Sequence, residues 1–356
     1  MKMALSFDDV LLVPQHNEIV SRKDVNTSTR LSKTLTLKIP IISSCMDTVT
    51  GSEMASAMWR AGGLGILHRY NTIEQQLQMF LSVRDSVVKE SHEMANCAIA
   101  VGATGDYFDR AQTLYRNGAK IFCIDVANGD SKISIEAIHR LRKEFPDTTL
   151  IAGNVATGEG CARLIDAGAD AIRAGIGGGS LCTTRIMTGH GVPTFQTVLD
   201  CHEYLWYRKY NDFCIISDGG IKNSGDIVKS IAAGASAVML GQLLASTDEA
   251  PGDTIYLPEG DPLAQPYKRY RGMASFGAQA DWRPEKKEDI VPEGEDTILP
   301  CKGSVDKMLY QLVGGLRSGM TYSNAKTLKE LKNNAQFRPI TSAGWAESKP
   351  HAKVGY

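Results

Sequence analysis

The sequence lacks the features that mark several specialised classes of protein. Its 356 residues contain no run of roughly 18 apolar residues, so we expect no transmembrane helix and no membrane partner. Charged residues precede any apolar stretch at the N-terminus, so no secretory signal is expected and a cytoplasmic location is predicted. The eight cysteines form no CxxC pair and the seven histidines form no HExxH motif, which argues against a disulfide framework or a zinc site.

The chain also lacks an excess of charge of either sign. It has 39 Lys and Arg residues against 40 Asp and Glu residues, a formal net charge of −1. This balance does not attract a nucleic-acid backbone, so no nucleic-acid partner is expected. What remains is an ordinary globular composition, 43% hydrophobic and 22% charged, in a chain long enough to bury a full core.

Eight short apolar runs alternate with helical patterns along the chain. Because these runs are apolar on both faces, they are typical of parallel strands covered by helices. Polar and glycine-rich segments follow several different strands, which favours a (β/α)8 barrel over an open doubly wound sheet with one switch point. The expected strands are 39–44, 64–67, 97–101, 121–125, 149–153, 171–174, 213–217 and 237–240.

Helix ends are marked by glycine and helix starts by capping residues. A glycine past the last turn can adopt the left-handed conformation that ends a helix. Four predicted helices end in a glycine shortly before a strand, namely Gly62, Gly118, Gly168 and Gly234. Two helix starts are also predicted, a capping box at 50–53 and an N-cap at Asn223.

The chain is longer than the roughly 250 residues of a typical barrel. We predict one catalytic barrel domain with additions: an N-terminal arm (1–38), the barrel core (39–254), a proline-rich segment (255–303), and a last helix with a polar tail (304–356). The last helix is expected near 304–313. The proline-rich segment fits either a disordered linker or a mobile flap over a site.

Segment 175–185 is the most informative for chemistry. It places four glycines within five residues and Cys182 behind them. Closely spaced glycines let backbone N–H groups approach an anion, although a flexible turn has the same composition. A lone cysteine is usually a small buried side chain, but one in a polar loop at the strand ends is a candidate nucleophile.

Further polar turns follow other predicted strands. The turns at 218–220 and 241–242 follow strands seven and eight, where barrels commonly bind phosphate, and Asp218 is suited to ribose hydroxyls. Turn geometry alone is the structural alternative. Asp125 and Asn154 end the fourth and fifth strands, where they either stabilise turns or contact a second ligand.

Seven phrases of the sequence resemble the IMP dehydrogenase and GMP reductase family, in the family's order and over nearly the whole chain. This family comprises nicotinamide-dependent purine-nucleotide enzymes that fold as a (β/α)8 barrel. Some members lack regulatory CBS domains. The glycine–cysteine loop together with the Asp-Gly-Gly turn is the most specific of these matches. The matching phrases are 6–14, 46–50, 152–155, 175–185, 217–221, 270–273 and 314–320.

The resemblance implies a role for each matching residue. Cys182 is implied to be the nucleophile that attacks purine C2, while Thr184 and Glu293 transfer protons. The implied contacts to a purine nucleoside monophosphate are Ser44, Met46, Ser180, Asp218, Gly219, Gly220, Gly241, Gln242, Tyr270, Gly272 and Met273. The implied contacts to the cofactor, NADPH or alternatively NAD, are Asp125, Asn154 and Arg173.

A cation and an assembly are implied in the same way. The carbonyls of Gly177, Gly179 and Cys182 match those that ligate a monovalent cation, K+, in the dehydrogenases. Gly178 replaces the proline or serine usual between the two glycines, which is expected to loosen the loop and puts the cation site in doubt. The family resemblance also implies a homotetramer.

Three features favour the reductase, which converts GMP to IMP and ammonia. About thirty residues separate strands two and three, which leaves no room for the regulatory insertion usual in dehydrogenases. Segment 125–129 has the reductase spelling. Residues 273–294 of the proline-rich segment lack the Arg-Tyr pair whose arginine activates water in dehydrogenases, and Glu293 matches the reductase glutamate.

Other segments leave alternatives open. Segments 46–50, 189–193 and 347–351 read more like a dehydrogenase, which oxidises IMP to XMP with NAD. A nucleotide-binding protein that has lost catalysis is a third interpretation. The presence of Cys182, Thr184 and Glu293 argues against it.

Overall fold

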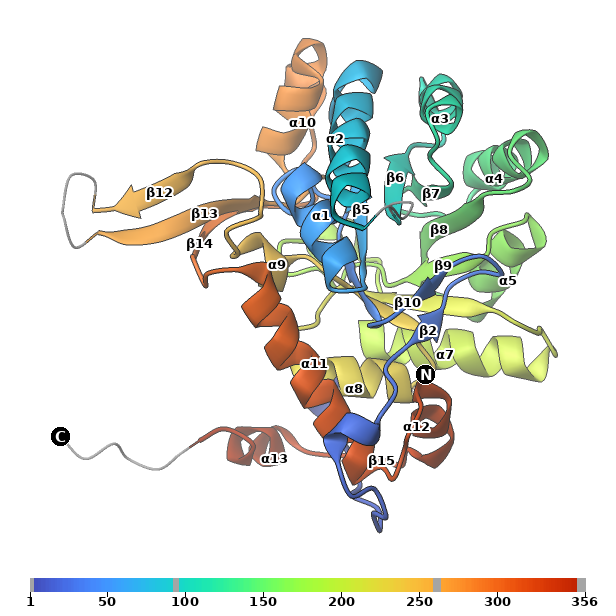
Figure 1. Cartoon of the computed structure of the whole chain (residues 1–356), viewed down its shortest axis with the longest axis vertical. Coiled ribbons are helices and arrows are strands. Elements are labelled where there is room, and N and C mark those ends of the chain that lie inside the picture. The colour runs from blue at the N-terminus through green and yellow to red at the C-terminus, as the bar shows by residue number, and fades with distance from the viewer. Residues whose placement is uncertain (1–2, 92–95, 259–263, 351–356) are drawn as a thin grey trace.

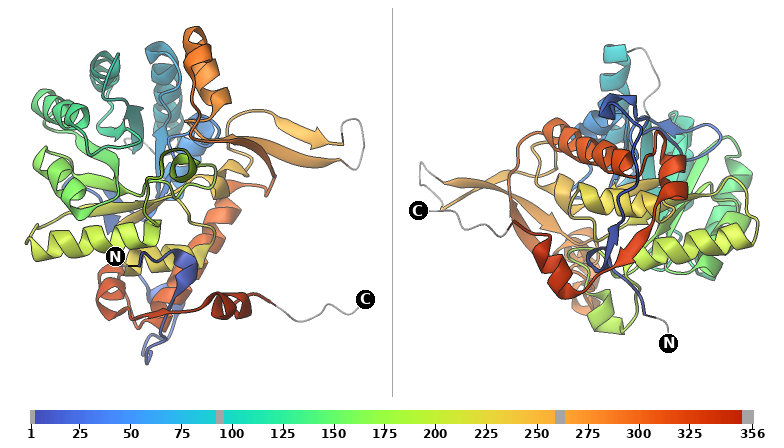
Figure 2. Two further views of the ribbon diagram at one scale, coloured as in Figure 1. Left: turned by 180° about the vertical axis from the view of Figure 1, so that it is seen from behind. Right: turned by 90° about the horizontal axis from the view of Figure 1, so that it is seen from below.

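The computed structural model describes residues 3–91, 96–258 and 264–350, and eight of its strands form a closed parallel barrel (Figures 1 and 2). These strands coincide with the eight predicted runs, so the barrel is confirmed over the open sheet. Around the barrel they follow the order β10-β11-β4-β5-β6-β7-β8-β9. Their bounds are β4 Ile41–Ser43, β5 Leu64–Leu67, β6 Cys97–Val101, β7 Ile121–Asp125, β8 Thr149–Val155, β9 Ala171–Ala174, β10 Cys214–Asp218 and β11 Ala237–Leu240.

Side chains along the strands alternate between two buried clusters. Ile42, Leu64 and Ala98 belong to the smaller cluster, which fills the barrel, whereas Ile41 and Leu67 pack outward with helix residues. Period-two alternation in strands that are buried on both faces produces this division.

The N-terminal arm closes one end of the barrel. It contains η1 Phe7–Asp9, β1 Val10–Leu12, η2 Arg22–Asp24, β2 Thr29–Arg30 and β3 Thr36–Leu37. Leu31 and Leu37 join the interior cluster, and the Ser32 hydroxyl lies 2.7 Å from that of Thr149, the first residue of β8. The arm therefore covers the amino ends of the strands and leaves their carboxyl ends to the site.

The predicted helix-capping residues are confirmed with one exception. All four predicted glycine caps have a φ between 80° and 117°. Asn223 caps α8 as predicted, because its side chain accepts a hydrogen bond from the Asp226 N–H. The bounds are α1 Ser52–Arg60, α2 Ile73–Ser91, α3 Tyr107–Arg116, α4 Lys132–Glu144, α5 Gly158–Asp166, α6 Thr184–Thr188, α7 Thr194–Tyr207, α8 Ser224–Ala232 and α9 Gln242–Ala245.

The exception is the capping box at 50–53, a prediction that is wrong. The N-cap of α1 is Gly51, and no side chain caps it. The Thr50 hydroxyl donates instead to the Ser44 carbonyl oxygen at 2.6 Å. A hydrogen bond to the residue after β4 has displaced the local cap, which sequence spacing alone does not reveal.

The described parts of the proline-rich segment, 255–258 and 264–303, are folded, so the interpretation of these parts as a disordered linker is wrong. It forms a three-stranded antiparallel sheet of β12 Thr254–Leu257, β13 Gln265–Arg271 and β14 Asp296–Pro300. Between β13 and β14 lie α10 Phe276–Trp282 and η3 Pro284–Asp289. Figure 1 shows this sheet projecting from the barrel while α10 stands beside α2. We call residues 265–300 the flap.

The C-terminal region is more ordered than the expected polar tail. The last barrel helix, α11, runs over Val305–Tyr322 and is longer than predicted. It is followed by α12 Leu328–Asn334, β15 Phe337–Pro339 and α13 Ser342–Glu347. Leu328 and Leu331 are buried, and β15 pairs antiparallel with β1, so the N-terminal arm is joined to the C-terminal region. Within the described ranges, every helix is too short or too polar to span a bilayer.

Candidate active site

The loops after β9 and β10 pack backbone against backbone at the carboxyl end of the barrel. A Cβ at Gly175 would lie 2.0 Å from the carbonyl oxygen of Asp218, and one at Gly219 would lie 3.0 Å from the Gly178 carbonyl carbon. Both glycines have a positive φ. Such close approach requires glycine, so the two segments singled out from the sequence form one structure.

Cys182, Thr184 and Glu293 form a hydrogen-bonded chain. The Cys182 thiol donates to the Thr184 hydroxyl oxygen at 3.1 Å. That hydroxyl donates in turn to a Glu293 carboxylate oxygen at 2.8 Å. Cys182 is one of two partly exposed cysteines, and six others are buried. The chain of donors runs from a thiol towards a carboxylate, which is the direction in which a nucleophile loses its proton.

Glu293 reaches this chain because the flap is hydrogen-bonded to the cysteine loop. The Thr183 N–H donates to the Glu293 carbonyl at 3.0 Å, and the Glu295 N–H donates to the Leu181 carbonyl at 3.0 Å. Cys182 and Gly294 form an antiparallel bridge. The end of the flap therefore lies alongside the cysteine loop like an added strand.

Five of the predicted nucleotide contacts surround one point beside the cysteine loop. The Ser180 and Tyr270 hydroxyls lie 3.1 Å apart. A Cβ at Gly241 would meet the Tyr270 hydroxyl at 3.0 Å and the Met46 sulfur at 3.4 Å, with the Cβ of Ser44 at 3.9 Å. Burial raises the pKa of Tyr270, against the hydrogen bond to Ser180, so its phenol remains a donor at neutral pH.

The remaining predicted nucleotide contacts lie around this group. Met273 accepts a hydrogen bond at its sulfur from the Asp47 N–H at 3.4 Å. Gly272 donates its N–H to the Glu295 carbonyl at 3.0 Å, which attaches it to the end of the flap. Gly220 has a φ of 76°, and Gln242 begins α9 directly after Gly241.

Asp125, Asn154, Arg173 and Asp218 form a polar network across the mouth of the barrel. Arg173 donates to Asp125 at 2.7 Å and to Asp218 at 2.9 Å. The Asn154 amide donates to the same oxygen of Asp218 at 2.8 Å. Arg173 is buried, so its position is fixed, and it connects the predicted ribose contact to the predicted cofactor contacts.

The charges within this network determine its ionisation. Burial by itself raises the pKa of Asp125, but the charges of Arg173 and Arg69 outweigh burial and hold that pKa below its ordinary value. Arg69, which was not among the predicted site residues, lies 3.3 Å from Asp125. Asp125 is therefore ionised at neutral pH and oriented by two arginines.

Sequence reasoning also missed the arginine that fixes the flap. Arg271, at the end of β13, pairs with Asp47 of the loop after β4 and with Asp281 of α10. His68 lies near this pair, and burial lowers its pKa to about 4, so its ring is neutral at pH 7. The phrase 270–273 contains Arg271, but its partners lie more than 200 residues away or within the flap helix.

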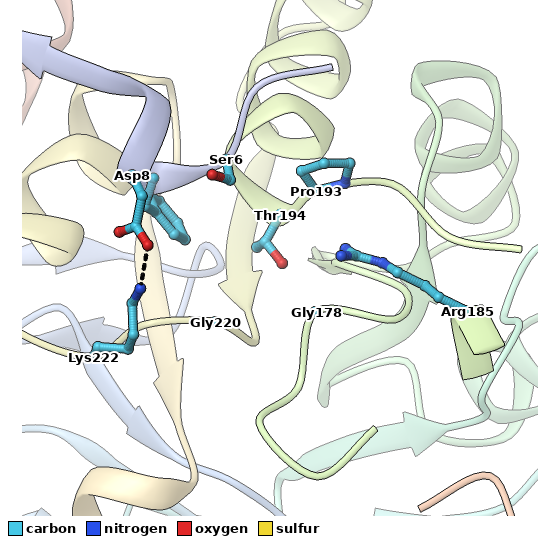
Figure 3. A pocket seen from close by; sticks show the side chains of 9 residues that line it. Ser6, Asp8, Gly178, Arg185, Pro193, Thr194, Gly220 and Lys222 are labelled. Carbon is cyan, nitrogen blue, oxygen red and sulfur yellow. Dashed lines mark hydrogen bonds and ion pairs between the residues drawn. The ribbon is translucent and has the colours of Figure 1, made fainter. Parts of the chain in front are cut away.

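Gly178 occupies a position with no room for a side chain, and its expected effect on the looseness of the loop stays a prediction. A Cβ at Gly178 would lie 2.2 Å from the Thr194 hydroxyl oxygen. Thr194 begins α7 and is buried, and its hydroxyl has no hydrogen-bond partner among the described residues. Both residues line a cavity of about 140 Å³, which Arg185 and Lys222 also line (Figure 3).

The backbone around Gly177, Gly179 and Cys182 is closely turned. The Cys182 N–H donates to the Gly179 carbonyl at 3.1 Å, and Gly177 has a φ of 79°. Among the described residues, no three His, Cys, Asp or Glu side chains gather as metal ligands. The cation site, which would use carbonyl oxygens, stays a prediction.

Comparison with known proteins agrees with this geometry. The sequence profile described as "IMP dehydrogenase / GMP reductase domain" matches residues 4–351. The chain is 33% identical to the inosine-5'-monophosphate dehydrogenase of Nitrosopumilus maritimus, covering 98% of each chain. It is 36% identical to that of Aquifex aeolicus, covering 99% of this chain and 96% of the relative. These alignments extend over 476 and 478 residues, so the relatives carry inserted residues that this chain lacks.

A solved structure is similar over the whole length. It is a cysteine-to-alanine variant of GMP reductase from Trypanosoma brucei in complex with guanosine 5'-monophosphate. The two chains are 31% identical, with a TM-score of 0.90 and 99% coverage of both.

Proposed function

The chain belongs to the IMP dehydrogenase and GMP reductase family of oxidoreductases, and we propose that it is a GMP reductase. It converts GMP to IMP and ammonia with NADPH, through a covalent bond between Cys182 and purine C2. The observation that carries this proposal is the chain from Cys182 through Thr184 to Glu293 of the flap, with distances of 3.1 and 2.8 Å.

The direction of these hydrogen bonds accounts for the first step. As the Cys182 sulfur attacks C2, its proton passes through the Thr184 hydroxyl to Glu293. Protonated Glu293 then returns the proton to the departing amino group, which leaves as ammonia because a neutral amine is a better leaving group than an amide ion. The product of this step is a thioimidate on Cys182.

The second step is a hydride transfer. NADPH, when bound, supplies a hydride to C2; the carbon–sulfur bond then breaks, releasing IMP and the Cys182 thiolate, and a proton from water restores the thiol. The network around Arg173 contains both the predicted ribose contact, Asp218, and the predicted cofactor contact, Asp125. It therefore orients both ligands while both carboxylates stay paired with Arg173. Preorganised charges of this kind cost no rearrangement during the reaction.

The dehydrogenase is the second candidate, because the curated relatives above carry that name. Its reaction needs a base that activates water. Residues 273–294 of the flap contain no Arg-Tyr pair, and Arg283, the only arginine among them, is followed by Pro284. The flap instead places a carboxylate next to Thr184, which suits amine protonation.

Assembly, cation and domain organisation complete the proposal. We propose a homotetramer of single-domain catalytic chains, in which the proline-rich segment 255–303 covers the site. K+ bound by the carbonyls of Gly177, Gly179 and Cys182 is part of the dehydrogenase alternative and is tested by measuring turnover with and without KCl.

The assay that tests the proposed function compares both reactions with the same enzyme. We expect loss of NADPH absorbance with GMP, together with formation of IMP. NADH formation from IMP and NAD, without turnover of GMP, would instead identify a dehydrogenase. Tight nucleotide binding with neither reaction would support a protein that has lost catalysis.

A further inference from the structure

A second cavity, of about 340 Å³, lies on the Asp125 side of the Arg173 network. Its lining comes from the loop between β6 and α3, from the end of β7 and from the flap. The volume is within the range of small-molecule sites and is sufficient for one half of a dinucleotide. Asp125 lines the cavity and bonds to Arg173, so the cavity adjoins the network that holds Asp218.

The flap contributes Trp282 and Arg283 to this cavity. Trp282 stacks on Tyr70, with ring centroids 5.7 Å apart and planes inclined by 16°. This contact fixes the end of α10 against the loop after β5. Arg283 follows directly, and its backbone N–H closes the helix on Gln279. The backbone of Arg283 is therefore fixed at the end of α10, and the residue lines the cavity.

The other charges lining the cavity are neutralised. Asp106 pairs with the buried Arg110 at 2.7 Å, and Asp125 pairs with Arg69 at 3.3 Å as well as with Arg173. Arg283 forms no ion pair or side-chain hydrogen bond with any residue that the structure describes. One unpaired, exposed positive charge is thus left at a nucleotide-sized cavity.

We propose that Arg283 is a specificity-determining residue that binds the 2'-phosphate of NADPH and so selects NADPH over NADH. This inference rests on the proposed function, since it assigns the cavity to the cofactor of that reaction. A guanidinium matches the geometry of a phosphate group and is charged at every relevant pH. NADH has a hydroxyl at this position and gains little from the same arginine.

The kinetic test uses Arg283→Gln and Arg283→Lys with GMP as the second substrate. We expect Arg283→Gln to raise KM for NADPH roughly tenfold while leaving kcat and KM for NADH unchanged. Arg283→Lys keeps the charge and should recover part of the NADPH preference. Lys287→Gln is the matched control, because Lys287 lies in the same flap but over the Phe276 ring, and it should change neither KM. Equal changes for NADPH and NADH in Arg283→Gln would overturn the inference.

A binding measurement separates this inference from the proposed reaction. Adenosine 2',5'-bisphosphate and adenosine 5'-monophosphate are titrated into wild type and Arg283→Gln by calorimetry. We expect the bisphosphate to bind roughly tenfold more tightly to wild type, with the difference lost in the variant. That result would hold for Arg283 even if GMP were not turned over, in which case only the proposed reaction fails. Equal binding of both probes to wild type would overturn the inference even if GMP is reduced.

Discussion

The barrel rim and the flap hold their side chains in different ways. On the rim, Arg173 is buried and bound to carboxylates from two other strands, so its position follows from the packing of the barrel. In the flap, Glu293 depends on backbone hydrogen bonds between its end and the cysteine loop. The comparison indicates that the Arg173 network is fixed by the packing of the barrel, whereas Glu293, on which the proposed reaction depends, is positioned by backbone hydrogen bonds between two loops.

Removing the nucleophile gives the largest expected effect and separates binding from chemistry. Cys182→Ala should lower kcat by at least roughly 10⁴-fold, since no covalent adduct can form. Binding of GMP, measured by calorimetry, should change little because Asp218 and the loops around Gly241 are untouched. Substantial turnover by this variant would contradict the covalent mechanism.

Changing the flap carboxylate should affect chemistry alone. Glu293→Gln keeps the shape of the side chain but cannot carry the proton, so we expect kcat to fall roughly 10²- to 10⁴-fold with GMP affinity retained. Glu295→Gln, two residues further along, is the control and should retain activity. If both variants were equally active, Glu293 would have no part in proton transfer.

Breaking the rim should instead destabilise the fold. Arg173→Met leaves Asp125 and Asp218 without their buried partner, so the free energy of unfolding should fall by about 3–5 kcal/mol in denaturant titrations at pH 7. Arg30→Ala, which breaks an exposed pair with Asp212, should cost less than about 1 kcal/mol. Similar losses for the two variants would show that the rim network does not stabilise the barrel.

The pairing of Arg173 with Asp125 also predicts how the free energy of unfolding depends on pH. The folded pKa of Asp125 lies below its ordinary value of 3.8, so its contribution to stability is present above that pH. The contribution is lost as the pH falls through the lowered pKa. The difference in unfolding free energy between wild type and Arg173→Met should therefore shrink below about pH 4, and a difference that grows on acidification would contradict this assignment.

The smallest effect is expected at the contact between Gly178 and Thr194. Gly178→Ser would place a Cβ 2.2 Å from the Thr194 hydroxyl, so the loop must shift at a cost of about 1–3 kcal/mol. We expect a lower kcat and a changed rate of Cys182 alkylation. The double variant Gly178→Ser/Thr194→Ala should recover both kcat and the rate of Cys182 alkylation. If neither recovered, a contact other than Thr194 would determine the position of the loop.

The barrel could be predicted because its signals are local. Eight apolar runs, four glycine caps and the Asn223 cap each depend on a few neighbouring residues, and all are present. The capping box at 50–53 failed because the Thr50 hydroxyl bonds to Ser44, the residue that follows β4. The C-terminal elements were missed because β15 is stabilised by pairing with β1, a partner more than 300 residues away.

The site was predictable in its residues but not in its connections. The glycine–cysteine loop and the turn at 218–220 could be predicted as parts of the site from their composition and from the family resemblance. Charged and aromatic pairs such as Arg173 with Asp218 and Tyr70 with Trp282 join distant segments, so no spacing in the sequence encodes them. Thr194 was missed because its role is to fill the space that Gly178 leaves.

The most direct measurement of the central claim follows the amino group of GMP. GMP labelled with ¹⁵N at the 2-amino position is incubated with the enzyme and NADPH. We predict one labelled ammonium ion and one IMP for each NADPH consumed, and none from Cys182→Ala. Absence of labelled ammonium, with NADH produced from IMP and NAD, would contradict the assignment of the chain as a GMP reductase.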